Sequence, residues 1–114
     1  MDIKTFNRLT EAYKSTIGQG KPSRNAEGKE ITSQSQSIWF DRKTIMKLLE
    51  QSDEGSGGLK IFFAAYDKEF TDDPELIGKL TVVLAASNDN EDPTEESQIE
   101  NGGRLCPPYC NGNI

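Results

Sequence analysis

Two apolar runs decide the fold: Leu59-Lys60-Ile61-Phe62-Phe63-Ala64-Ala65-Tyr66 and Leu80-Thr81-Val82-Val83-Leu84-Ala85-Ala86. We expect each of them to form a strand. Successive side chains of a strand point to opposite faces, so Ile61 and Phe63 share one face while Phe62 and Tyr66 share the other. Both faces of the predicted sheet are therefore largely apolar.

A sheet that is apolar on both faces must be covered on both. Burying one large apolar side chain stabilises a fold by about 1.5–3 kcal/mol relative to leaving it in water. A single layer of helix leaves one face without that gain. The sequence therefore predicts either that helices divide between the two faces, or that a second molecule covers one of them.

Two helices are expected before the first strand. Asp2 is a suitable N-cap, and apolar residues then recur at steps of three and four until Gly18 ends the pattern: Phe6, Leu9, Tyr13 and Ile17. Asp41 caps a second helix over residues 42–51. Residues 30–40 are expected to be extended, and Asp73-Pro74 predicts one helical turn that runs to Ile77.

These elements predict an α+β fold, in which a small, mostly antiparallel sheet packs with two helices and the C-terminal segment is disordered. Residues 1–86 form a single α+β domain that contains a polar loop at residues 18–35. Residues 87–114 form a flexible segment that is first acidic and then contains cysteine and proline.

The charge is unevenly distributed. The chain has 13 basic and 19 acidic residues, which gives a formal net charge of −6. Residues 87–103 hold six of the acidic residues and no basic one, whereas residues 1–86 are close to neutral with 12 basic and 13 acidic residues. We expect the acidic segment to keep the protein soluble or to contact a basic partner.

The segment Cys106-Pro107-Pro108-Tyr109-Cys110 allows several interpretations. The favoured one is a proline-stiffened segment with two free thiols. A metal or redox role for Cys106 and Cys110 is the alternative, and docking is a third. The chain has no histidine, so a zinc ion held by these cysteines needs carboxylates or a second chain. A disulfide across so short a loop would constrain little of the chain.

Several function classes are disfavoured. The absence of histidine removes the commonest general base, and nothing in the sequence places two carboxylates together, so we expect no enzyme and no cofactor. The negative net charge opposes binding to nucleic acid. No run approaches the roughly 18 apolar residues of a membrane span, and the N-terminus does not have the pattern of a signal peptide. We therefore expect a cytoplasmic protein that contacts neither nucleic acid nor membrane.

Four segments carry a resemblance to a known group of proteins: Ser37-Ile38-Trp39-Phe40-Asp41, Ile61-Phe62-Phe63-Ala64-Ala65-Tyr66, Gly78-Lys79-Leu80-Thr81-Val82-Val83 and Leu105-Cys106-Pro107-Pro108-Tyr109-Cys110. This pattern resembles a family of small uncharacterised bacterial proteins. The resemblance implies one unit of strand, helix, strand and strand, and it implies no activity.

The favoured hypothesis is a non-catalytic protein-interaction module, for example an acidic partner or inhibitor of a basic protein. Its partner is another protein or a second copy of the chain, and the candidate contact residues are aromatic: Trp39, Phe62, Tyr66 and Tyr109. Two alternatives stay open. Asn101-Gly102-Gly103 resembles the end of leader peptides, which suggests a precursor whose cysteine segment is cleaved or modified. The cysteines also suggest a metal-linked or thiol-linked dimer.

Overall fold

The computed structural model describes residues 1–110 of the chain. Its helices are α1 (Ile3–Ser15) and α2 (Arg42–Leu49), with short 3-10 helices η1 (Ile17–Gln19) and η2 (Glu96–Gln98). Its strands are β1 (Ser37–Trp39), β2 (Gly57–Ala65), β3 (Leu80–Asn88), β4 (Ile99–Glu100) and β5 (Arg104–Cys106). The predicted α+β class is confirmed.

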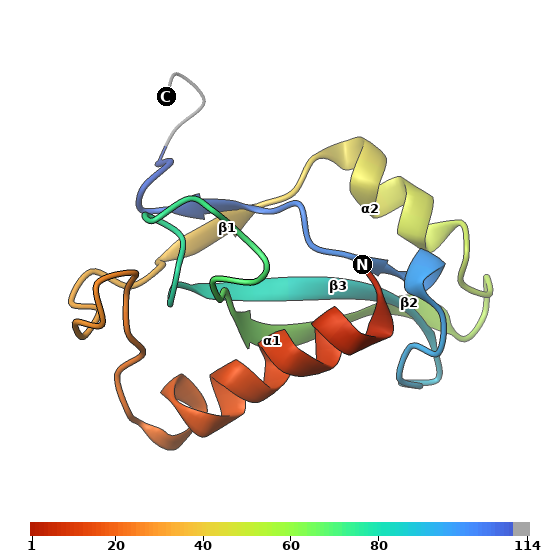
Figure 1. The fold of residues 1–114 in the computed structure, drawn as a ribbon. Helices are drawn as coiled ribbons and strands as arrows, with labels where there is room; N and C mark the ends of the chain where they lie inside the picture. The colour runs from red at the N-terminus through yellow and green to blue at the C-terminus, as the bar shows by residue number, and fades with distance from the viewer. Residues whose placement is uncertain (111–114) are drawn as a thin grey trace.

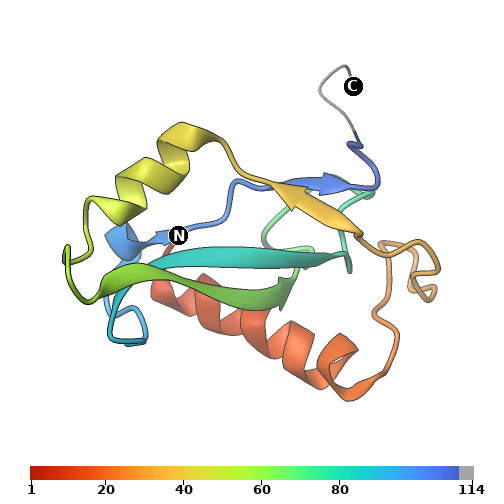
Figure 2. The same ribbon diagram turned by 180° about the vertical axis from the view of Figure 1, so that it is seen from behind.

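The strands form two antiparallel sheets. The larger has the order β2-β3-β4, and β1 pairs with β5 in a separate two-stranded ribbon. Strands β2 and β3 pair along their whole length, from Gly57 opposite Asn88 to Ala65 opposite Leu80. Leu105 of the β1–β5 ribbon packs into the same cluster as Phe6 and Leu9 of α1. Figures 1 and 2 show α1 on one side of the larger sheet and α2 on the other. The helices therefore divide between the two faces, which is one of the two arrangements that the sequence allows.

Each helix begins at the aspartate that the sequence indicates. The Asp2 carboxylate accepts a hydrogen bond from the Thr5 N–H at 2.7 Å, and the Asp41 carboxylate accepts one from the Thr44 N–H at 2.8 Å. These caps satisfy N–H groups that have no partner inside the helix. Backbone and side-chain hydrogen bonds from Thr5 lower the pKa of Asp2, and the same two kinds of bond from Thr44 lower the pKa of Asp41.

The two faces of the larger sheet have separate apolar cores. The α1 side is built on a cluster of seven buried residues: Phe6, Leu9, Ala64, Tyr66, Val83, Ile99 and Leu105. The α2 side is smaller and is built on three: Leu48, Leu84 and Ala86. The side-chain alternation predicted for the two strands accounts for this division, because Ala64 and Val83 face α1 while Leu84 faces α2.

The prediction of a disordered C-terminal segment is wrong for residues 87–110. Ile99 and Leu105 are each only 1% exposed and belong to the α1-side core. Strand β4 extends the larger sheet, and β5 pairs with β1. The N-terminal amine of Met1 also donates a hydrogen bond to the Ile99 carbonyl at 3.1 Å. Residues 111–114, the last part of that prediction, lie outside the described residues.

Two smaller expectations also need correction. Of the extended stretch predicted at residues 30–40, only Ser37–Trp39 forms a strand of a sheet. The helical turn predicted to run from Pro74 to Ile77 is a series of turns.

In the part of the chain that the structure describes, no helix is both long enough and apolar enough to cross a membrane.

Candidate interaction surface

Strand β2 is an open edge of the larger sheet, because β3 is its only neighbouring strand among residues 1–110. The ladder continues beyond both of its ends: the Tyr66 N–H donates to the Lys79 carbonyl at 3.2 Å, and the Asp89 N–H donates to the Ser56 carbonyl at 2.9 Å. In an antiparallel pair, every second residue bonds to the opposite strand. Even-numbered residues of β2 therefore bond to β3, and the backbone groups of odd-numbered residues point outward.

The outward backbone groups lack partners within residues 1–110. No backbone hydrogen bond outside the strand ladders involves residues 58–65. The N–H and C=O groups at the edge belong to four residues: Leu59, Ile61, Phe63 and Ala65. An edge with such groups is a template for pairing with another strand.

Two of these residues also expose large apolar side chains. Ile61 is 56% exposed and Phe63 is 54% exposed. Helix α2 covers the far end of the same face, where Leu59 packs against the cluster of Leu48 and Leu84. At the other end, the Phe63 ring contacts the Tyr13 ring of α1, with 5.4 Å between ring centroids. We call Leu59, Ile61, Phe63 and Ala65 the β2 edge.

Carboxylates lie at both ends of the β2 edge. At its start, exposed carboxylates come from the turn that precedes β2 and from the loop that follows β3: Glu50, Asp53, Glu54, Asp89, Glu91 and Asp92. At its end, the loop from β2 to β3 begins with the half-buried Asp67 and the exposed Glu69. Asp73 and Glu75 of the same loop lie beside the C-terminal loop, where Asp73 bonds to Tyr109. An apolar edge thus has an acidic start, while the carboxylates at its end lie beside Arg8 and the exposed Lys68.

Part of this charge is neutralised within the molecule. Arg8 donates two hydrogen bonds to Asp67, from Nε at 2.6 Å and from Nη2 at 3.2 Å, and its other terminal nitrogen lies 3.3 Å from Glu69. Burial raises the pKa of Asp67, but the bonds from Arg8 and from the Phe70 N–H outweigh it, and the pKa lies below its ordinary value. Lys60 forms an ion pair with Asp92 at 2.7 Å.

A second group of exposed apolar side chains lies on β1 and α2. Trp39 is 59% exposed, Met46 44% and Leu49 42%. A shallow hollow is lined by five residues: Trp39, Phe40, Arg42, Ile45 and Met46. The guanidinium carbon of Arg104 lies 5.1 Å from the centre of the Trp39 ring, so one face of that ring already contacts a cation.

The four aromatic contact residues predicted from the sequence have different environments. Trp39 is exposed, as a contact residue must be. Tyr66 is 6% exposed, and Phe62 packs against the α1-side core with its ring centroid 4.9 Å from that of Phe6. Burial raises the pKa of Tyr66. Tyr66 is therefore a core residue and Phe62 is partly buried against the same core, so neither side chain is freely exposed, and their role as contact residues stays a prediction.

Tyr109, the fourth, has an internal partner. Its hydroxyl donates a hydrogen bond to Asp73 Oδ2 at 3.1 Å, and this bond raises the pKa of Tyr109. The bond ties the C-terminal loop to the loop between β2 and β3. Tyr109 is accordingly placed to hold two loops together.

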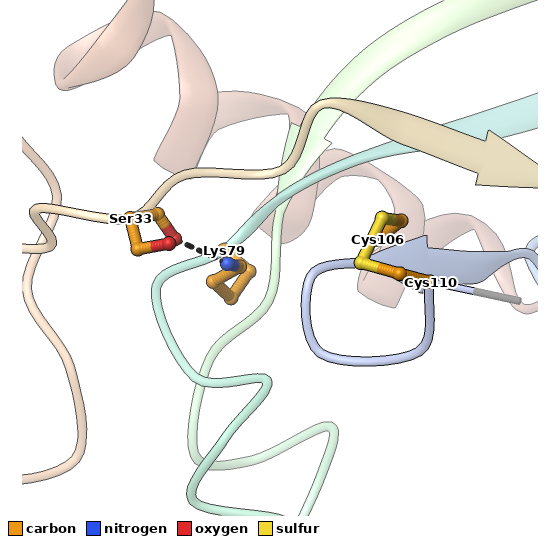
Figure 3. Close-up of a disulfide and its surroundings, with 4 residues drawn as sticks. All are labelled: Ser33, Lys79, Cys106 and Cys110. Atoms are coloured by element: carbon orange, nitrogen blue, oxygen red, sulfur yellow. Dashed lines mark hydrogen bonds between the residues drawn. A yellow bond between two sulfur atoms is a disulfide. The ribbon is translucent and has the colours of Figure 1, made fainter. Parts of the chain in front are cut away.

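The two cysteines form a disulfide with each other, so the prediction of two free thiols is wrong. Cys106 ends β5, and Cys110 lies across the loop that Pro107 and Pro108 form, with 4.3 Å between the two Cα atoms (Figure 3). Disulfide sulfurs are not thiolates, so this pair does not offer the ligands that a zinc site needs. Within residues 1–110, no group of three or more candidate ligands gathers to hold a metal.

Figure 3 also shows a buried lysine beside the disulfide loop. Lys79 is 5% exposed, and its ammonium donates a hydrogen bond to the Ser33 carbonyl. Burial lowers the pKa of Lys79. In the same region the Leu80 N–H donates to the Gln34 side-chain oxygen at 2.6 Å, so both contacts hold the loop before β1 against the start of β3.

Sequence reasoning did not select Ile61 and Phe63 as contact residues. The signal was present, because alternation assigns both to one face of an apolar strand. What was missing was the order of the strands, which makes β2 the edge and leaves these two side chains uncovered.

Neither a protein-family model, nor a curated protein, nor a solved structure matches this chain. The resemblance to a family of small bacterial proteins therefore stays a prediction.

Proposed function

We propose that this protein is a non-catalytic module that binds a basic protein partner at the β2 edge. One observation carries the proposal. Ile61 and Phe63 are each more than half exposed on an open strand that has carboxylates at both of its ends. A partner that covers this strand gains apolar contact along its middle and ion pairs at its ends.

The apolar contact supplies part of the affinity. Full burial of one large apolar side chain contributes about 1.5–3 kcal/mol, and roughly half of that gain is still available at each of Ile61 and Phe63. Such residues resemble the few central anchors that dominate most protein interfaces.

The carboxylates at the two ends supply selectivity for basic partners. Carboxylates at the rim of an interface speed the encounter with an oppositely charged partner and disfavour an acidic one. The net charge of −6 acts in the same direction. This contribution weakens with salt, because exposed charges are screened beyond about 8 Å at physiological ionic strength.

Release of the C-terminal cysteine segment is not part of this proposal. Leu105 lies in the α1-side core, and the backbone of Gly103 packs closely against Ile38 and Phe40. Cleavage after Gly103 would remove a core residue. A thiol-linked dimer is likewise not favoured, since Cys106 and Cys110 pair within one chain.

The proposal is tested by selecting peptides from a random twelve-residue display library against the immobilised full chain. We expect the enriched peptides to carry more Lys and Arg than the library, and to bind the double variant Ile61→Thr/Phe63→Thr at least tenfold more weakly. Threonine keeps the preference for a strand while removing most of the apolar surface.

Met46→Thr/Leu49→Thr is the matched control, because it removes comparably exposed apolar side chains from α2. It should leave peptide binding unchanged. The proposal fails if the enriched peptides have no basic excess, or if the two double variants bind them equally well.

A further inference from the structure

The geometry points to strand addition: we infer that the partner contributes an extended segment, apolar at alternate positions and basic at both ends, which pairs with the β2 edge as a fourth strand of the larger sheet. This inference rests on the proposed function and specifies its binding mode. The segment that binds the edge belongs to a different protein and not to a second copy of this chain.

The first support is that the free backbone groups and the exposed side chains belong to the same residues. Ile61 and Phe63 have outward N–H and C=O groups and side chains more than half exposed. In an antiparallel pair, directly opposite residues that exchange both hydrogen bonds also have neighbouring side chains. One residue of the segment opposite Ile61 therefore satisfies two backbone groups and covers an apolar side chain.

The second support is that the edge lacks the usual protection against pairing. Natural edge strands are commonly guarded by lysine, proline or a bulge. β2 contains no proline and pairs with β3 without a bulge. Its one lysine, Lys60, belongs to the even-numbered residues on the α1 side, where its ammonium bonds to Asp92 and the Asn90 carbonyl and lies 5.4 Å from the centre of the Phe62 ring.

The third support is charge, which separates a foreign segment from a second copy. Antiparallel pairing of two β2 strands would place the start of one beside the end of the other. The exposed Asp53 and Glu54 of one copy would then approach the exposed Glu69 and the half-buried Asp67 of its partner, whose charges Arg8 balances only in part. Like charges in an interface oppose assembly, whereas Lys and Arg at both ends of a foreign segment meet carboxylates at both.

The dimensions of β2 set the length of the segment. Its nine residues extend over roughly 30 Å, at about 3.4 Å per residue. A segment of about nine residues therefore reaches the carboxylates at both ends. Its central residues lie opposite Ile61 and Phe63.

The test uses the synthetic peptide Arg-Lys-Val-Thr-Val-Thr-Val-Lys-Arg with a fluorescent label, titrated with the full chain and followed by anisotropy. Two derivatives replace backbone amides with esters, which deletes N–H donors without adding bulk. One derivative carries the esters at the three valines, and the other carries them at the two threonines.

We expect one derivative to lose at least tenfold in affinity and the other to lose less than threefold. Loss at the valines indicates antiparallel pairing, because residues opposite Ile61 and Phe63 then donate to the edge. Loss at the threonines indicates parallel pairing. Equal affinities for the two derivatives, or no binding of the parent peptide up to 1 mM, would overturn strand addition.

A variant of the protein provides an independent measurement. Ile61→Pro removes an outward N–H and not one that bonds to β3, so proline is compatible with this position of an edge strand. It should fold, as judged by circular dichroism, and lose peptide binding at least tenfold, whereas Ile61→Val should keep it. A folded Ile61→Pro that binds as wild type contradicts the inference, and if this variant does not fold, the ester comparison decides.

Sedimentation equilibrium of the full chain without peptide checks the choice of occupant. We expect a monomer. A dimer that is abolished by Ile61→Pro would show that a second copy of the chain, and not a foreign segment, binds the β2 edge. One further result is library peptides that need Ile61 and Phe63 for binding and yet lose no affinity when their backbone amides are replaced by esters. That result would contradict strand addition and would still support the proposed function.

Discussion

β2 and β3 are similar in sequence and different in environment. Each has nine residues, both are apolar on both faces, and they pair residue for residue. Yet Leu84 of β3 is 4% exposed, while Ile61, directly opposite in β2, is 56% exposed. The reason is position: in the part of the chain that the structure describes, β3 has a strand on each side, and β2 has a strand on one side only. Composition makes both strands suitable for burial, and strand order decides which of them is buried.

The largest expected effect comes from removing the segment that makes β3 central. Deleting residues 99–114 takes away β4, β5 and two core residues, Ile99 and Leu105. Loss of those two side chains alone costs about 3–6 kcal/mol, which approaches the whole stability of many small domains. We expect the cooperative thermal transition, followed by circular dichroism at 222 nm, to disappear.

Arg104→Ala in the full chain is the control for this deletion, because Arg104 is an exposed residue of β5. It should keep the transition. A truncated chain that unfolds as cooperatively as the full chain would show that β4 and β5 are not part of the stable unit. The position of β4 would then not explain why the side chains of β3 are less exposed than those of β2.

A smaller effect separates the two members of one cross-strand pair. Leu84→Ala empties a buried site on the α2 side and should cost about 2–5 kcal/mol in the free energy of unfolding. Ile61→Ala, directly opposite, should cost less than about 1 kcal/mol, since most of its side chain is already in water. Urea unfolding of the two variants measures both values. Equal costs would mean that Ile61 is covered in solution, for instance by self-association.

The sequence predicted those features of the fold that short patterns specify. The caps at Asp2 and Asp41 were identified because their side chains satisfy N–H groups within the next turn. The division of faces in β2 and β3 followed from alternation alone. For the same reason the sequence assigned Ile61 and Phe63 to one face.

The features that escaped prediction depend on contacts between distant segments. Ile99 and Leu105 are single apolar residues within polar surroundings, so no periodicity marks them, and only pairing with β3 and β1 buries them. Tyr66 was a candidate contact residue because aromatic residues favour interfaces, but it is buried in the same cluster as Phe6 and Leu9 of α1. The candidate site was missed because strand order depends on contacts between distant segments. No local pattern indicates that β2 is the edge strand among the described residues.

The smallest expected effect concerns how α1 is held to the end of β2. Arg8 of α1 binds Asp67, whose pKa lies below its unfolded value of about 3.9. A carboxyl with a lowered pKa binds fewer protons in the folded state, so its stabilisation is present above pH 4 and is lost as the pH falls through the folded pKa. Because both side chains are partly exposed, the pair contributes only about 0.5–1 kcal/mol.

Asp67→Asn should therefore lower the stability measured by urea unfolding at pH 7 by that amount, and the difference from wild type should close as the pH falls from about 5 to 2. Asp72→Asn is the matched control in the same loop, because Asp72 is exposed and makes no ion pair among the residues described. A gap at Asp67 that persists unchanged at pH 2 would show that the substitution acts by packing and not by charge. The tie between α1 and the end of β2 would then be apolar, through contacts such as that of Tyr13 with Phe63.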